Sequence, residues 1–87
     1  MIPFEKTLEQ FLCRKVKELG GKCIKMTGEK GIPDRLVILP GGKCVFVELK
    51  REGEKPRPIQ EFRIKQLMQL GCNVLVMDSK EDLIHLV

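Results

Sequence analysis

Two short apolar segments joined by a tight turn constrain the fold of this chain more than any other feature. Residues 35–39 (RLVIL) form a nearly continuous, partly β-branched apolar run, which is typical of a strand covered on both faces. Residues 44–50 (CVFVELK) have the pattern of a second strand. Because the intervening Pro40-Gly41-Gly42-Lys43 is a strong turn signal, the two segments predict a β-hairpin.

Helical and strand patterns flank this hairpin on both sides. In chain order they predict a helix at 4–19 that ends at Gly20-Gly21, a strand at 22–27, a helix at 59–70 with Pro58 as its first residue, a strand at 73–77, and a short closing helix that begins at Ser79 with Asp82 in a loose capping box. The element order is αβββαβα. We therefore expect a single α/β domain over residues 1–87, with a central mixed β-sheet flanked by helices.

Composition excludes several classes of function. The chain has no tyrosine or tryptophan and only 4 phenylalanines, so stacking on single-stranded bases is a poor hypothesis. A net charge of +4 suits a polyanionic partner but equally suits an ordinary soluble protein. The 4 cysteines include no CxxC pair and there is only 1 histidine, which argues against a zinc site.

The cysteines and the apolar runs also bear on the compartment. Each cysteine lies beside apolar residues, so we expect reduced thiols in a reducing cytoplasm, with a disulfide framework as the less favoured alternative. No apolar run approaches the ~18 residues of a membrane span, and the N-terminus lacks a secretory pattern. The expectation is a cytoplasmic protein that is not secreted and has no membrane partner.

The strand at 44–50 carries an anomaly. Alternation places Glu48 and Lys50 on one face, together with Cys44 and Phe46. A carboxylate and an ammonium then stand side by side on an otherwise apolar strand. An isolated pair of this kind is better explained by a strand that emerges into solvent, where the pair would contribute little.

Asp34 favours the interpretation of Glu48 and Lys50 as part of a functional site, because it opens the preceding strand directly after Gly31-Ile32-Pro33. Its position depends on the hairpin turn. An even number of turn residues would pair Asp34 with Leu49 and place Asp34 and Glu48 on opposite faces of the sheet. An odd number, or a bulge, would place them together, so a site that uses both predicts such an irregularity or an Asp34 just ahead of regular pairing.

Two carboxylates and a lysine suit phosphodiester chemistry. Mg²⁺ or Mn²⁺ binds a few carboxylates and completes its coordination with waters and phosphate oxygens. A bound ion makes water more acidic and stabilises charge on phosphorus. Lys50 could orient that water or neutralise the phosphate. Asp34, Glu48 and Lys50 are therefore our candidate catalytic residues.

At these residues the chain resembles the PD-(D/E)xK nucleases, through Pro33-Asp34 and Glu48-Leu49-Lys50. More narrowly, residues 31–60 (GIPDRLVILPGGKCVFVELKREGEKPRPIQ) are similar to the virus-type replication-repair nuclease (VRR-NUC) domain. The resemblance extends over nearly the whole chain. It implies a restriction-endonuclease-like core, Mg²⁺- or Mn²⁺-dependent DNA endonuclease activity, and, as in small members similar to Holliday-junction resolvases, a homodimer that acts on branched DNA.

The resemblance also suggests further site residues. A glutamate of the leading helix approaches the metal in related nucleases, and both Glu5 and Glu9 lie on one shoulder of the apolar stripe, with Glu9 slightly favoured. The expected metal site thus comprises Asp34, Glu48, Glu9, Glu5 and Leu49. Gln60 matches the family's downstream glutamine, which adds it to the candidate catalytic residues, and it lies inside an apolar arc, so we expect it to hydrogen-bond near Lys50.

Basic residues surround the proposed site in the sequence. The candidates for binding DNA phosphates are Lys25, Lys30, Arg35, Arg51, Lys55 and Arg57, of which Lys55 and Arg57 belong to a polar loop. A solvated charge is the alternative for each of them. Two other functions are open for the whole chain: a catalytically inactive DNA-binding module or partner subunit of the same fold, and a structural α/β domain with charges at its strand ends.

Overall fold

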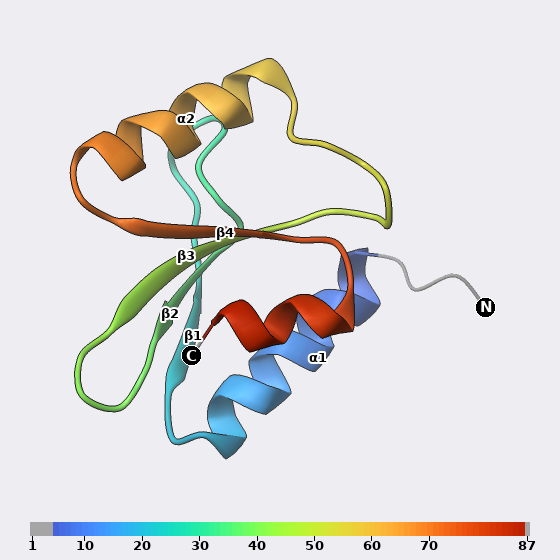
Figure 1. Cartoon of the computed structure of the whole chain (residues 1–87), viewed down its shortest axis with the longest axis vertical. Helices are drawn as coiled ribbons and strands as arrows, with labels where there is room; N and C mark the ends of the chain where they lie inside the picture. The colour runs from blue at the N-terminus through green and yellow to red at the C-terminus, as the bar shows by residue number, and fades with distance from the viewer. Residues whose placement is uncertain (1–4, 87) are drawn as a thin grey trace.

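The computed structural model describes residues 5–86, and side chains from Thr7 onward. Its elements are α1 (Glu5–Glu18), β1 (Lys22–Lys25), β2 (Arg35–Ile38), β3 (Cys44–Leu49), α2 (Pro58–Gln69), β4 (Asn73–Met77) and the 3₁₀ helix η1 (Lys80–His85). The strands form a four-stranded sheet in the order β1-β2-β3-β4. In Figure 1, α1 and η1 cover one face of this sheet and α2 lies over the other. The predicted α/β class and element order are confirmed.

The sheet is mixed, as expected. β1 and β2 are antiparallel, β2 and β3 are antiparallel, and β3 and β4 are parallel. The parallel pair requires a long crossover, and α2 provides it. The two antiparallel pairs leave β1 at one edge of the sheet and β4 at the other.

The hydrophobic core lies on one face of the sheet. Alternate residues of the central strands, among them Val37, Val45 and Val47, point toward α1 and are almost fully buried. The core consists of Leu8, Leu12, Val16, Val37, Leu39, Val45, Val47, Leu49, Met77 and Leu86. On the opposite face the cover is thinner, because Gln60 is the one residue of α2 that is buried.

The element bounds differ slightly from those that the sequence suggests. β1 ends at Lys25 rather than at Thr27, although the backbone amide of Met26 still donates to the carbonyl of Asp34 at 2.9 Å. The closing helix is of the 3₁₀ type, and its predicted start is confirmed: Asp82 Oδ2 accepts a hydrogen bond from the Ser79 amide at 3.2 Å. Over residues 5–86, the structure contains no helix with the length and apolarity that crossing a bilayer would need.

Candidate active site

The turn between β2 and β3 determines which residues share the site. Leu39 and Lys43 bracket Pro40-Gly41-Gly42, with the Leu39 amide donating to the Lys43 carbonyl at 2.8 Å. The Gly42 amide donates to the Leu39 carbonyl at 3.0 Å, and Gly41 has φ 93°, as residue i+2 of a type II turn requires. The turn therefore has an odd number of residues, which is the number needed to place Asp34 and Glu48 on the same face of the sheet.

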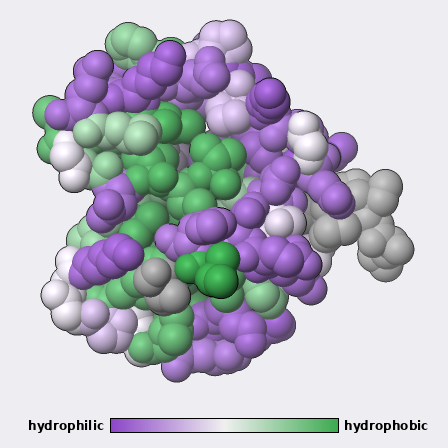
Figure 2. Space-filling view, viewed as in Figure 1, coloured by the Kyte–Doolittle hydropathy of each residue, from purple (hydrophilic) through white to green (hydrophobic). Residues whose placement is uncertain are grey.

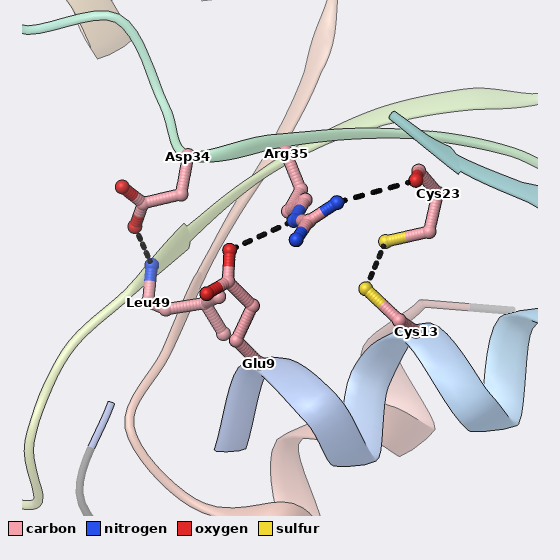
Figure 3. Close-up of polar contacts among 6 residues, drawn as sticks. All are labelled: Glu9, Cys13, Cys23, Asp34, Arg35 and Leu49. Atoms are coloured by element: carbon pink, nitrogen blue, oxygen red, sulfur yellow. Dashed lines mark hydrogen bonds and ion pairs between the residues drawn. The ribbon is translucent and has the colours of Figure 1, made fainter. Parts of the chain in front are cut away.

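The resulting register brings the two acids together. Arg35 pairs with Val47 and Leu36 with Phe46. Continued by one residue, this register places Asp34 opposite Glu48, on the face of the sheet that α2 covers. Asp34 lies just ahead of β2, and its Oδ2 accepts a hydrogen bond from the Leu49 amide at 2.9 Å (Figure 3).

The segment before Asp34 explains why these residues precede it. Gly31 has φ +82°, and a Cβ at this position would lie 2.8 Å from the Ile59 carbonyl oxygen. Only glycine therefore permits both the backbone conformation and the close approach to the start of α2. Pro33 is almost fully buried behind it. These two residues define the path of the chain where it enters β2.

Glu48 and Lys50 are buried, so the alternative of a solvent-exposed pair is wrong. Glu48 is 1% exposed and Lys50 is 7% exposed. Lys50 Nζ lies 3.5 Å from Glu48 Oε2, whereas Glu48 Oε1 has no hydrogen-bond partner although it is buried. A buried carboxylate oxygen without a partner is energetically costly and calls for an explanation.

The environment changes the proton affinity of Glu48. Burial, and after it the nearby charge of Asp34, raise the pKa of Glu48 against the opposing effect of Lys50, and the net result is a pKa of about 7. Without a cation the site thus holds two acidic groups that resist being ionised together. A bound cation would relieve this repulsion.

A cleft of about 370 Å³ opens at these residues. It is lined by Asp34, Glu48, Leu49, Lys50, Glu54, Lys55, Arg57 and Gln60. Among the side chains that the structure describes, no group of three or more His, Cys, Asp or Glu is placed to hold a metal ion. Two carboxylates and a backbone carbonyl nevertheless fit Mg²⁺ or Mn²⁺, which retain several waters. The Oε1 atom of Glu48, which has no hydrogen-bond partner, could act as a ligand to such an ion.

Gln60 and the loop before α2 complete the cleft. Gln60 is 8% exposed, and its Oε1 accepts a hydrogen bond from the Arg57 amide at 2.8 Å. It shares the cleft with Lys50, but its oxygen caps α2 rather than bonding to that lysine. Lys55 and Arg57 are exposed at the rim, as phosphate-binding residues need to be.

Glu9 and Arg35 lie elsewhere. Arg35 Nε donates to Glu9 Oε2 at 2.8 Å, and Arg35 Nη1 donates to the Cys23 carbonyl at 3.4 Å (Figure 3). Because Arg35 pairs with Val47, this ion pair lies on the α1 face of the sheet, away from the cleft. The geometry thus gives no support to Glu9 as a metal ligand or to Arg35 as a phosphate contact, and the side chain of Glu5 lies outside the described residues.

The remaining basic candidates are also outside the cleft lining. Lys25 is exposed on the edge strand β1, and Lys30 is exposed in the following loop, where its carbonyl accepts a hydrogen bond from Arg63 Nε at 3.0 Å. Arg51 Nε lies 3.8 Å from Glu54 Oε1. The structure therefore brings Lys55 and Arg57 to the site but leaves Lys25, Lys30 and Arg51 at its periphery.

Two residues near the site were missed by reasoning from the sequence. Glu54 lines the cleft, and Asp78 Oδ2 accepts a hydrogen bond from the Gly53 amide at 3.1 Å, which ties the loop to the end of β4. Glu54 is one of several charges in the loop, and nothing in its spacing marks it. Asp78 follows an apolar strand, a position that signals a strand end but no partner.

Comparisons with known proteins define the class. No protein-family model matches the chain. A solved structure described as a VRR_NUC domain superposes with a TM-score of 0.82 at 34% sequence identity, covering 95% of this chain and 94% of that chain. The fold is therefore that of a VRR_NUC domain.

A protein with a similar sequence identifies the family to which the chain belongs. The chain is 44% identical over 79 residues to "Putative nuclease p44" of Acyrthosiphon pisum secondary endosymbiont phage 1, covering 88% of this chain and 85% of that protein. The chain therefore belongs to the VRR-NUC family, a branch of the PD-(D/E)xK nucleases, as its sequence motifs predicted.

Proposed function

We propose that this protein is a Mg²⁺- or Mn²⁺-dependent DNA endonuclease that hydrolyses phosphodiester bonds in the cleft between β3 and the loop before α2. One observation carries the proposal: the Oε1 atom of Glu48 is buried without a hydrogen-bond partner, and the charge of a second acid, Asp34, acts on the same carboxylate. This arrangement is costly in the free protein and favourable once a cation is bound. The relatives supply the reaction class.

Each residue of the cleft has a role in this proposal. Asp34 and Glu48, with the carbonyl of Leu49, would hold the ion, which supplies Lewis-acid stabilisation of the phosphate and a more acidic water. Lys50 places a positive charge next to Glu48, where it can orient the attacking water or neutralise the scissile phosphate. Lys55 and Arg57 would hold the flanking phosphates, and Gln60 fixes the loop that carries them.

The DNA structure and the oligomeric state are also part of the proposal. We infer that the substrate is branched DNA of the Holliday-junction type and that the enzyme acts as a homodimer, because the family resemblance implies both. A homodimer would present two clefts, one for each strand of a symmetric junction. The alternative function is a DNA-binding module that retains the cleft without cleaving.

The direct test is cleavage of branched and linear DNA in the presence of Mg²⁺ or Mn²⁺. We expect cleavage by the wild-type protein and a loss of at least ~10²-fold in Glu48→Gln, because the variant lacks a carboxylate at the ion site. Glu52→Gln is the matched control, since Glu52 is exposed and lies outside the cleft lining. Absence of cleavage with either ion would refute the proposed nuclease activity. DNA binding without cleavage would favour the inactive DNA-binding module.

A further inference from the structure

Two cysteines that the cleft does not use lie in contact on the other face of the sheet. Cys13 on α1 and Cys23 on β1 are both partly buried, and their sulfur atoms are 3.0 Å apart (Figure 3). A disulfide needs sulfurs about 2.05 Å apart. The two thiols therefore require a shift of only about 1 Å to become bonded.

We propose that Cys13 and Cys23 form a disulfide by exchange with a low-molecular-weight disulfide such as oxidised glutathione, and that this bond fastens α1 to the edge strand β1. The contact between the two sulfurs carries the inference. It is independent of the nuclease function, because Cys13 and Cys23 lie outside the cleft lining.

The environment of the pair assigns an order to the exchange. Burial, and after it the hydrogen bond with Cys13, raise the pKa of Cys23 to about 12. Cys23 is thus almost never a thiolate at neutral pH, and the first attack falls to Cys13. Cys13 is also reachable, because it lines a shallow surface hollow of about 260 Å³ with Glu9, Gln10 and Arg35.

The atoms balance in two steps. The Cys13 thiolate attacks one sulfur of the small disulfide, whose other half leaves as a thiolate and takes up a proton. The Cys23 thiol then loses its proton and attacks the Cys13 sulfur of the mixed disulfide, releasing the second small thiol. The protein loses two hydrogens, and one molecule of oxidised glutathione becomes two of reduced glutathione.

The position of the pair sets the structural consequence. The bond would span 10 positions in the chain, across the turn at Gly20-Gly21. It would also lie next to the carbonyl of Cys23, which already accepts a hydrogen bond from Arg35. The linkage therefore reinforces the existing attachment of α1 to β1 and β2. It also reduces the number of conformations that the unfolded chain can adopt.

The experiment uses a variant in which the other cysteines are removed, Cys44→Ser with Cys72→Ser. This step is needed because the parallel register of β3 and β4 brings positions 44 and 72 side by side. The reduced variant is incubated with oxidised glutathione, free thiols are alkylated, and the mass is measured. We expect a loss of two hydrogens, a Cys13–Cys23 cross-linked peptide, and a Tm higher by roughly 5–15 °C that dithiothreitol reverses.

Two further variants make the result decisive. Adding Cys13→Ser to the same background should abolish both the mass loss and the rise in Tm, and Cys23→Ala should do the same; circular dichroism checks that each variant is folded. The proposal is overturned if the folded parent variant keeps two alkylatable thiols, or if it stops at a glutathione adduct. An intermolecular disulfide, seen as a doubled mass without reductant, would overturn it equally.

Discussion

The protonation of Glu48 is linked to folding, because burial changes its pKa. Its pKa is raised to about 7, first by burial and then by the charge of Asp34, against an ordinary value of 4.5. Folding therefore favours the protonated carboxyl. The contribution of the protonated Glu48 carboxyl to the free energy of unfolding is fully present below pH 4.5 and is lost as the pH rises through 7.

This linkage predicts that Glu48→Gln stabilises the metal-free protein at alkaline pH. At pH 8 the free energy of unfolding should increase by roughly 2–3 kcal/mol, because the neutral amide avoids the cost of a buried charge. At pH 4 the variant and the wild type should be equally stable. Urea unfolding in EDTA, followed by circular dichroism, measures both values, with Glu52→Gln as the exposed control. Equal stability of Glu48→Gln and the wild type at pH 8 would show that Glu48 is ionised without cost.

The residues of the site were predictable to different degrees. Asp34, Glu48 and Lys50 stood out in the sequence because the Glu48-Leu49-Lys50 segment follows Gly31-Ile32-Pro33-Asp34 across a hairpin, whereas the charged pair alone would have been explained by exposure to solvent. The partner of Glu9 was not predictable in this way. It depends on how α1 rotates against the sheet, and the 2.8 Å contact with Arg35 joins residues 26 positions apart.

At the level of elements, the β2–β3 hairpin controls the site. The sequence predicted both strands, but the number of residues in a turn with two glycines is set by the pairing that the whole sheet reaches. Both parities were open until the register was known. The three-residue turn then placed Asp34 and Glu48 on one face. The boundaries of β1 and the 3₁₀ character of η1 escaped prediction because local pattern does not fix where pairing stops.

The loop between β3 and α2 supports a prediction about DNA binding. Lys55 and Arg57 are exposed at the rim of the cleft, and the loop is held by Asp78 at Gly53 and by Gln60 at Arg57. Lys55→Gln with Arg57→Gln should weaken DNA binding by roughly 10-fold or more and reduce its salt dependence by about two charges.

The measurement for the loop is a DNA titration at several salt concentrations in the Glu48→Gln background, which prevents cleavage. Lys17→Gln with Lys22→Gln is the matched control, because it removes the same charge from exposed positions outside the cleft lining. An equal loss in both double variants would mean that net charge, and not the loop, determines affinity.

On the scale of the whole molecule, the two faces of the sheet are covered unequally. The core fills the face under α1 and η1, whereas α2 buries a single polar residue; Met68 near its end is 56% exposed, and Leu70, which follows it, is 76% exposed. β4 forms the edge of the sheet, and Ile84 of η1 is 72% exposed. Figure 2 shows apolar surface across the middle of this side of the molecule, between α2 and η1. Exposed apolar surface of this kind fits a contact with another protein chain.

We therefore expect the proposed homodimer to form on this side, around β4 and the end of α2. Light scattering at micromolar concentration should give about twice the chain mass of 10.0 kDa for the wild type. Met68→Lys with Leu70→Lys should give the monomer, because two desolvated ammonium groups would cost several kcal/mol in a closed apolar contact. Ile24→Lys is the control, since Ile24 is 38% exposed on β1, at the opposite edge of the sheet. A wild-type mass near that of one chain would contradict the dimer, and a dimer that survives both lysines would place its interface elsewhere.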